Sequence, residues 1–256
     1  LHQVIEQQGF DKNVVSVIPD TSRGVIEELL KQKETIDLVI PRGGEGLIRY
    51  VTENSQIPVI QHFKGVCHLF IDKSADLTKA VNILVNGKTQ KPSACNAFET
   101  LLVHQDISEQ FLPLAAKALA EAAQVKVHAC EKSIHYFDGG QLATSDDYHA
   151  EYLAQEIAVK VVNSFDDAVS HINEFTSDHT EVIVTQDISR SQTFIRQINS
   201  SVVMVNASSR FSDGNQLGLG SEIGISTSKL HAFGPMGLEA LTTEKFVVFG
   251  DGQIRE

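Results

Sequence analysis

The sequence predicts an α/β protein built on a parallel sheet that helices cover on both faces. Short continuous apolar runs, such as VVSVI at residues 14–18 and EVIVT at 181–185, are typical of buried parallel strands. Segments with an apolar period of 3.6 residues, typical of helices, alternate with these runs along most of the chain. At 256 residues, the chain can bury a sizeable core and hold more than one structural unit.

The first part of the chain alternates predicted helices and strands. We expect helices over about residues 1–8, 22–30 and 46–53, and strands over 14–18, 36–40 and 58–60. Thr21 or Ser22 can cap the second helix, because a short hydroxyl side chain accepts a free N–H of the first turn. This alternation indicates a parallel sheet.

The turn Arg42-Gly43-Gly44 follows one of these strands and precedes a helix. Open parallel sheets bind ligands at such a point, and helix N-termini attract phosphate. The glycines allow the backbone to approach a ligand closely, and Arg42 can meet a phosphate. The alternative is a helix-entry turn that simply needs glycine.

The middle of the chain repeats the alternation. We expect helices over about residues 77–85, 109–123, 166–175 and 189–198, and strands over 99–104, 125–129, 157–162, 181–185 and 202–205. In the first of these helices, apolar residues recur on one face at positions 77, 80, 81, 84 and 85. Asp72 or Ser74 can cap its start.

Cys95 lies on a short loop between that helix and the strand at 99–104. Pro92 ends the helix, because proline lacks a backbone donor and its ring collides with the preceding turn. A thiol held between two rigid elements can be aimed, and loop amides can receive negative charge that develops on a substrate oxygen. The alternative is a small buried apolar residue.

Composition limits the classes of partner. A net charge of −12 argues against nucleic acid and anionic membranes, both of which need a basic surface. No apolar run approaches the roughly 18 residues of a membrane span. Three cysteines without paired spacing predict a reducing, cytoplasmic compartment. We expect no metal site, because His62, Cys67 and His68 lack the usual spacing of metal ligands.

Three segments resemble one known family. They are IPRGGEGLIRYV at 40–51, NGKTQKPSACNAFETLLVH at 86–104 and VNASSRFSDGNQLGLGSEIGISTSKLHAFGPMGLEALT at 205–242. These segments are similar to gamma-glutamyl phosphate reductase, also called glutamate-5-semialdehyde dehydrogenase, within the aldehyde dehydrogenase superfamily. The resemblance runs nearly end to end. It implies NADPH-dependent reduction of L-glutamate 5-phosphate in proline synthesis, through a thioester.

The resemblance assigns roles to particular residues. It implies that Cys95 is the nucleophile and that Glu151 accepts hydrogen bonds from the nicotinamide ribose. It also places Arg42, Gly43 and Gly44 beside the cofactor. A thiol of ordinary pKa needs activation, and Lys88 and Lys91 are the cations nearest to it in sequence.

Residues 206–214 are expected to line the substrate mouth. A glutamyl substrate carries a carboxylate that Arg210 can bind with two parallel hydrogen bonds. The other expected substrate-binding residues are Asn96, Ser208, Ser209 and Asp213. The alternative is a surface loop stabilised by its own side chains.

Two further features bear on the reaction. Hydrolysing aldehyde dehydrogenases carry a glutamate that activates water where this chain has Gln61-His62-Phe63, so a hydrolysing activity is disfavoured. In the segment HAFGPMGLE, Phe233 stands where the resembled family commonly has arginine. That arginine would either contact an anion or brace a turn.

The resemblance also implies an organisation. Residues 1–65 would be the remainder of a nucleotide-binding domain, 66–205 the catalytic domain, and 206–256 the substrate-mouth loop, a return segment and an oligomerisation strand. The run KFVVFG at 245–250 would pair with a partner's sheet, giving at least a homodimer. Relative to the family, a long N-terminal part is absent, so we expect a fragment. A non-catalytic oligomerisation module therefore remains the alternative function.

Overall fold

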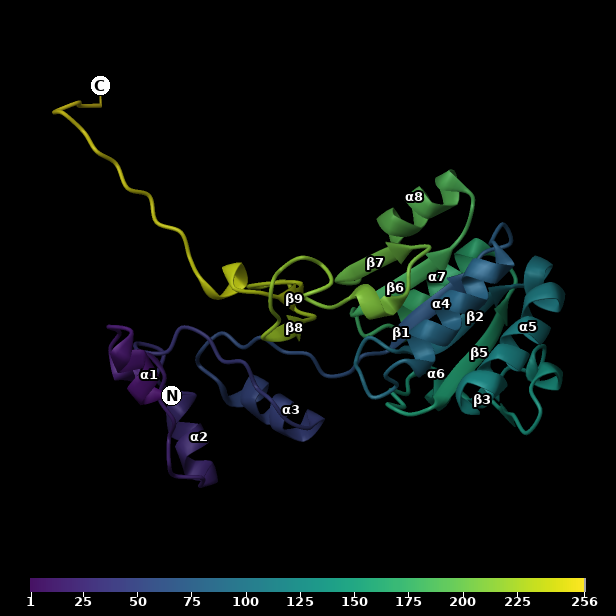
Figure 1. Ribbon diagram of the computed structural model, residues 1–256, viewed down its shortest axis with the longest axis horizontal. Helices are drawn as coiled ribbons and strands as arrows, with labels where there is room; N and C mark the ends of the chain where they lie inside the picture. Colours follow the sequence, from purple (N-terminus) through teal and green to yellow (C-terminus); the bar gives the residue numbers. More distant parts are fainter. Residues whose placement is uncertain (256) are drawn as a thin grey trace. The chain divides into compact units, whose positions relative to one another are not determined.

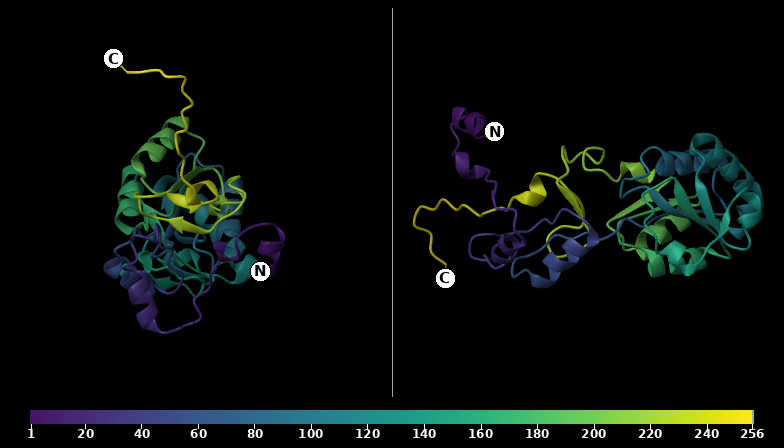
Figure 2. Two further views of the ribbon diagram at one scale, coloured as in Figure 1. Left: turned by 90° about the vertical axis from the view of Figure 1, so that its left-hand side faces the viewer. Right: turned by 90° about the horizontal axis from the view of Figure 1, so that it is seen from below.

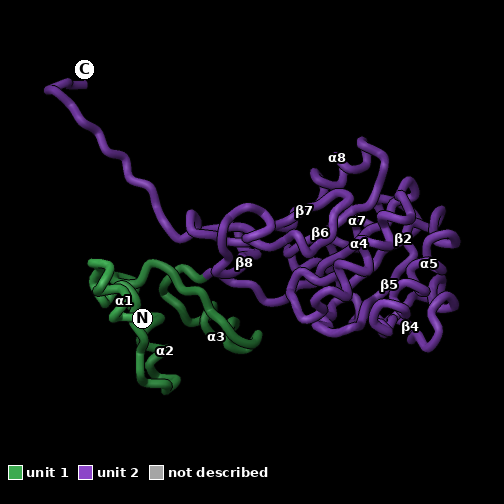
Figure 3. Tube along the Cα trace, in the orientation of Figure 1, with its two compact units in different colours: residues 1–59 green, residues 60–256 purple. Residues whose placement is uncertain are grey.

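A computed structural model describes residues 1–255, so Glu256, the end of the predicted third domain, lies outside the described residues. The chain forms two compact units, Leu1–Val59 and Ile60–Glu256, shown in green and purple in Figure 3. The three-part division at residues 65 and 205 stays a prediction. Within the described residues, no helix is long and apolar enough to cross a membrane.

The first unit consists of short helices joined by extended segments. Its elements are α1 (His2–Gln7), the 3₁₀ helix η1 (Lys12–Val14), α2 (Arg23–Leu29) and α3 (Glu45–Asn54). Ser22 is the N-cap residue of α2, but its hydroxyl makes no capping hydrogen bond, so the expected side-chain cap is wrong. Ile48 and Val51 of α3 are buried, so the apolar face of this helix supplies part of a small core.

The second unit is organised around one seven-stranded sheet, in which all six neighbouring pairs of strands are parallel. The strand order is β4-β3-β5-β2-β1-β6-β7. The strands are β1 (Cys67–Ile71), β2 (Phe98–His104), β3 (Lys126–Ala129), β4 (Gln141–Leu142), β5 (Glu156–Val162), β6 (Thr180–Val184) and β7 (Val202–Val205). This arrangement confirms the predicted α/β class with a parallel sheet.

Helices cover both faces of this sheet, as Figures 1 and 2 show. One face packs against α4 (Leu77–Thr89) and α5 (Gln105–Ala123) through apolar side chains such as Leu84 and Phe111. The other packs against α7 (Phe165–Phe175) and α8 (Ile188–Gln197) through Phe165 and Phe194. Alternate residues of one strand serve the two faces: Leu69 belongs to the first core and Phe70 to the second. This double burial explains the continuous apolar strands.

Short elements complete the second unit. They are η2 (Ile134–Tyr136), α6 (Ser145–Tyr148), η3 (Ser209–Phe211), the antiparallel pair β8 (Gly224–Ser226) and β9 (Gly234–Met236), and η4 (Glu239–Leu241). Near β9, Phe233 is half-buried and the Nζ of Lys229 lies 5.1 Å from its ring centroid.

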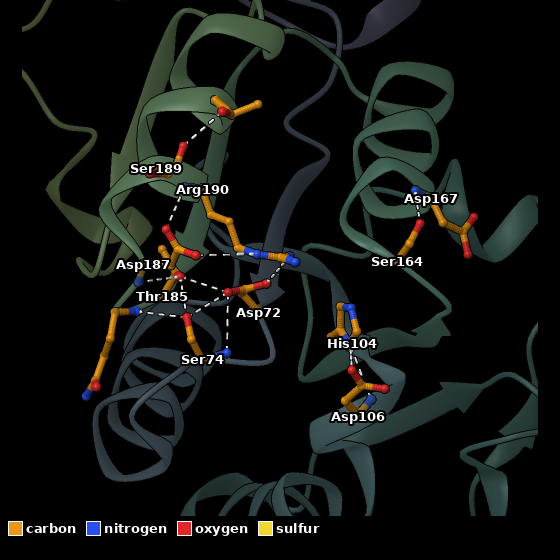
Figure 4. Close-up of polar contacts among 12 residues, drawn as sticks. Asp72, Ser74, His104, Asp106, Ser164, Asp167, Thr185, Asp187, Ser189 and Arg190 are labelled. Atoms are coloured by element: carbon orange, nitrogen blue, oxygen red, sulfur yellow. Dashed lines mark hydrogen bonds and ion pairs between the residues drawn. The ribbon is translucent and has the colours of Figure 1, made fainter.

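A polar network ties elements together at the carboxyl edge of the sheet (Figure 4). Asp72 follows β1, and its carboxylate accepts hydrogen bonds from Thr185 Oγ1 at 2.8 Å and Arg190 Nη1 at 2.7 Å. Ser74 Oγ donates to the same carboxylate at 2.8 Å. Asp72 therefore holds β6 and α8 rather than capping α4, whose N-cap residue is Asp76.

Several predicted strands do not form. Residues 14–18 pair with no described strand, and of the strands expected at 36–40 and 58–60 only a parallel bridge between Val39 and Val59 is present in the described chain. Residues 245–250 form no strand within this single chain, where Phe246 and Phe249 are almost fully exposed, and their expected pairing with a partner's sheet stays a prediction. A strand gains its stability from a hydrogen-bonded neighbour, which apolar pattern alone does not supply.

The acid stability of the second unit should depend on His171 of α7. Burial, reinforced by His68 and Lys160, lowers the pKa of His171 from 6.5 to about 2. Between these values the unfolded chain takes up a proton that the folded chain does not, so stability falls as pH drops below 6.5. Because of His171, we expect the free energy of unfolding to fall by about 1.5 kcal/mol between about pH 6.5 and about pH 5.

Urea unfolding followed by circular dichroism across this pH range tests the contribution. His171→Phe should lose less stability on acidification than the parent, because its ring takes up no proton. His135→Gln, at an exposed position, should follow the parent. Parallel pH curves for His171→Phe and the parent would contradict the assignment.

Candidate active site

Cys95 lies at the amino edge of the sheet, on the loop between α4 and β2. Its thiol is half-buried, and its carbonyl oxygen accepts a hydrogen bond from the Sγ of Cys67 at 3.3 Å. Gly65 passes so close that a Cβ at this position would overlap the same carbonyl. Gly65 N–H in turn donates to Glu151 Oε1 at 2.7 Å. The backbone around Cys95 is therefore held from two sides, and Glu151 is brought next to this loop.

A buried ion pair brackets the Cys95 loop. Lys88 in the last turn of α4 donates from Nζ to Glu99 Oε2 at 2.6 Å, and both side chains are fully buried. The second carboxylate oxygen of Glu99 accepts the backbone N–H of Leu153 at 3.2 Å. Burial raises the pKa of Glu99 and lowers the pKa of Lys88, so each charge depends on the other. The pair joins the two elements that flank Cys95 to the segment that carries Glu151.

The electrostatic surroundings keep the Cys95 thiol protonated at neutral pH. Burial, together with Glu222 and Glu151, raises its pKa from 9.0 to about 11. Its own backbone N–H and Arg210 act in the opposite direction. The expectation that Lys88 activates the thiol is wrong, because Lys88 is paired with Glu99. A positive charge or base must reach the sulfur before it can act as a nucleophile.

Three predicted substrate-binding residues meet beside this loop. Asn96 accepts a hydrogen bond from Arg210 Nη1 through Oδ1 and donates from Nδ2 to Ser212 O at 2.8 Å. Ser209 is fully buried and donates from Oγ to Asn96 O at 2.5 Å. Arg210 Nε also donates to Gln90 Oε1 at 2.7 Å. The structure therefore brings Asn96, Ser209 and Arg210 together, with part of the guanidinium already engaged.

The remaining residues of the predicted mouth have local roles. Ser208 caps η3 by accepting the N–H of Arg210 at 3.3 Å, and Asp213 Oδ1 accepts the N–H groups of Asn215 and Gln216 at 3.1 Å. Arg210 and Asp213 line a cavity of about 430 Å³. The other residues of its wall are Asn86, Gln90, Phe211 and Gln216. Two of the predicted polar residues thus face one cavity.

The turn Arg42-Gly43-Gly44 belongs to the first unit, whereas the other predicted site residues belong to the second. Gly43 and Gly44 are exposed, and Arg42 is exposed as well. Gly44 is the N-cap of α3, and among the described residues no side chain caps that helix end. An exposed arginine beside an uncapped helix N-terminus fits an anionic group such as a cofactor phosphate.

Sequence reasoning missed several residues of this edge. Glu222 raises the pKa of Cys95, and His62 and His179 each bring a ring nitrogen within 4.8 Å of its Sγ. The three residues lie far from Cys95 in the sequence. His62 and His179 lie on the segments that lead into β1 and β6, and only the strand order shows that these segments and the Cys95 loop before β2 are neighbours.

Comparison with known proteins places the chain in a family. Residues 1–135 match the aldehyde dehydrogenase family, which is more than half of the sequence. The chain belongs to the aldehyde dehydrogenase family. It is 82% identical over all 256 residues to the gamma-glutamyl phosphate reductase of Colwellia psychrerythraea, and it spans 61% of that relative's length. The resemblance predicted from the sequence is thereby confirmed.

Solved structures of other proteins show the same fold. The crystal structure of gamma-glutamyl phosphate reductase from Thermotoga maritima matches with a TM-score of 0.94 and 44% identity, over all of this chain and 61% of that one. The glyceraldehyde-3-phosphate dehydrogenase GapN of Methanocaldococcus jannaschii, solved in complex with NADP, matches with a TM-score of 0.65 and 17% identity. That match covers 83% of this chain and 55% of the other. At this lower identity the likeness shows the fold alone.

Removing one member of the buried ion pair should destabilise the second unit. In Lys88→Met, the Glu99 carboxyl loses its cation while it stays buried, and we expect a loss of about 3–5 kcal/mol in unfolding free energy. Lys88→Met combined with Glu99→Leu should recover much of this loss, because no charge is left unpaired.

Urea unfolding followed by circular dichroism measures both effects. Lys117→Met is the matched control, since Lys117 of α5 makes an exposed ion pair with Glu121 at 3.9 Å. A Lys88→Met chain as stable as the Lys117→Met chain would show that the buried pair does not hold the loop.

Proposed function

We propose that this chain forms the catalytic part of an NADPH-dependent reductase. The reductase converts L-glutamate 5-phosphate to L-glutamate 5-semialdehyde and phosphate in proline biosynthesis. The observation that carries the proposal is Cys95, held on a braced loop beside the Asn96–Arg210 contact. The name of the Colwellia relative, 82% identical over the whole chain, supports this choice of substrate.

The proposed first step is acyl transfer to sulfur. The sulfur of Cys95 attacks the acyl carbon of the substrate, the bond from that carbon to the phosphate oxygen breaks, and phosphate leaves with the bonding electrons and takes up the thiol proton, which gives a thioester. The backbone N–H of Cys95, which lowers the pKa of its own thiol, would donate to the oxygen that becomes negative. When bound, NADPH supplies the hydride that reduces such a thioester to the aldehyde.

The chain's residues fit the two anionic partners of this reaction. Arg42 and the uncapped N-terminus of α3 would hold a cofactor phosphate, and Glu151 would accept hydrogen bonds from a ribose. Arg210, with Ser208, Ser209, Asp213 and Asn96, would orient the glutamyl group. Because Arg210 already donates to Gln90 and Asn96, its guanidinium is aligned before substrate arrives.

The C-terminal segment supports a homo-oligomer. The apolar side chains Phe246, Val248 and Phe249 are all more than four-fifths exposed. Apolar residues at this exposure indicate a surface that another chain covers. We therefore retain the proposal that residues 245–250 pair with a partner copy, although they form no strand within one chain.

Replacing the sulfur of Cys95 by oxygen should abolish turnover. Because this chain spans 61% of its Colwellia relative, the test uses a chimera in which it replaces the matching segment of that protein. With L-glutamate 5-phosphate and NADPH, we expect Cys95→Ser to lower kcat about a thousandfold or more. Cys130→Ser, whose thiol hydrogen-bonds with Ser133, serves as the control and should keep the parent rate.

Parent-like turnover of Cys95→Ser would contradict the proposal. Glutamate formation from the semialdehyde and NADP without added phosphate would instead support the hydrolysing alternative. A chimera with a parent-like oligomeric state that fails to bind NADPH would support the non-catalytic module.

A further inference from the structure

Two histidines converge on the Cys95 thiol from distant parts of the chain. One ring nitrogen of His62, one of His179 and the Sγ of Cys95 all lie within 4.8 Å of one another. His62 precedes β1, Cys95 precedes β2 and His179 precedes β6, and these three strands are adjacent in the sheet. Neighbouring parallel strands start at the same edge, so the fold itself gathers the three side chains.

The hydrogen bonds around His179 determine which of its ring nitrogens is available. Thr180 Oγ1 donates its proton to Ser212 Oγ at 2.8 Å, so it can only accept from His179 Nδ1, which lies 2.8 Å away. The proton of His179 therefore sits on Nδ1, and Nε2 carries a lone pair. Nε2 is fully buried and has no hydrogen-bond partner among the described residues. A buried acceptor without a donor is costly, and a cation would satisfy it.

We propose that His62, Cys95 and His179 form a binding site for a divalent cation of the zinc class, with one position left open. Imidazole nitrogen and thiolate sulfur are the ligands that such a cation prefers, and three protein ligands leave a fourth tetrahedral position for water. The sequence analysis predicted no metal site because His62, Cys67 and His68 lack the usual ligand spacing. That spacing argues only against a site formed by one short segment, whereas the three proposed ligands lie on three segments that are distant in the sequence.

The geometry of the three side chains fits this cation after a small adjustment. Two ligands of one tetrahedral zinc ion, at bond lengths of about 2.0 and about 2.3 Å, are separated by about 3.5 Å. The present spread of up to 4.8 Å would close to this value on binding, and the half-buried His62 and Cys95 are less confined than the buried His179. The hydrogen bond from His179 Nδ1 to Thr180 supplies the outer contact that orients a metal-binding imidazole.

His179 and Cys95 can also reach the protonation states that a bound cation requires. The hydrogen bonds around His179 leave the lone pair of its Nε2 available to a cation. The cation would displace the proton from the Cys95 thiol, as metal binding to cysteine does. Glu222 and Glu151 act on the same sulfur, and their negative charges would favour a cation there.

The consequence for activity rests on the proposed function. A cation bound to Cys95 Sγ occupies the lone pairs that attack an acyl carbon, so the metal-loaded chain would be inactive as a reductase. The site would then act as a reversible block on the nucleophile that responds to free zinc. Metal binding itself does not require turnover and can be measured separately.

Titration with Co²⁺ tests the site, because a Co²⁺–thiolate bond gives an absorption band in the near ultraviolet. The parent chain should develop this band with one equivalent of Co²⁺ and lose it when Zn²⁺ is added. Cys95→Ala should show no band. His62→Ala and His179→Gln should bind about tenfold more weakly or worse, since even the loss of an outer contact costs about 10–100-fold. Cys130→Ser is the matched control and should bind as the parent does.

Mass spectrometry gives a second readout. Zn²⁺ should protect Cys95 from iodoacetamide in the parent, and it should protect less in His62→Ala, whose half-exposed position makes the substitution compatible with folding. Absence of the Co²⁺ band in the parent, an unchanged band in His62→Ala, or equal labelling of Cys95 with and without Zn²⁺ would overturn the site. If the chimera binds the metal at this site but its turnover does not need Cys95, the proposed function would be contradicted and the metal site would stand.

Discussion

The buried ion pair between Lys88 and Glu99 is the constraint on which the Cys95 loop depends. It joins the last turn of α4 to the start of β2, and Glu99 also holds the backbone at Leu153. Two charges in an apolar interior stabilise a fold only when their partners are well placed, so such a pair specifies geometry more than it adds stability. The segment between Lys88 and Glu99, which contains Cys95, is thereby fixed at both ends, and the segment that carries Glu151 is brought to the same edge.

The two edges of the sheet have different tasks. At the carboxyl edge, Asp72, Thr185 and Arg190 engage one another and hold β1, β6 and α8 together. The amino edge carries the chemistry, because the segments that enter β1, β2 and β6 bring His62, Cys95 and His179 into one place. The thiol there is protonated at neutral pH, which leaves its activation to a substrate, a cofactor or a cation.

The sequence predicted the fold class and most elements of the second unit, because strands buried on both faces and amphipathic helices have clear apolar patterns. Cys95 and the contact partners Asn96, Ser209 and Arg210 were also predicted, mainly through resemblance. The strand expected at 14–18 is wrong, since strand formation needs a hydrogen-bonded neighbour that an apolar pattern does not reveal. His62 and His179 were missed because their proximity to Cys95 depends on strand order, and Glu222 was missed because it comes from a distant loop before β8. Lys88, expected to act on the thiol, is instead paired with Glu99.

Direct detection of an acyl group on sulfur is the most decisive measurement. The chimera is mixed with L-glutamate 5-phosphate without NADPH, quenched in acid, digested and analysed by mass spectrometry. The account predicts one glutamyl adduct, on Cys95, that hydroxylamine removes as expected for a thioester and that NADPH discharges before the quench. Absence of an adduct on Cys95, or equal acylation of Cys95 and Cys130, would contradict it.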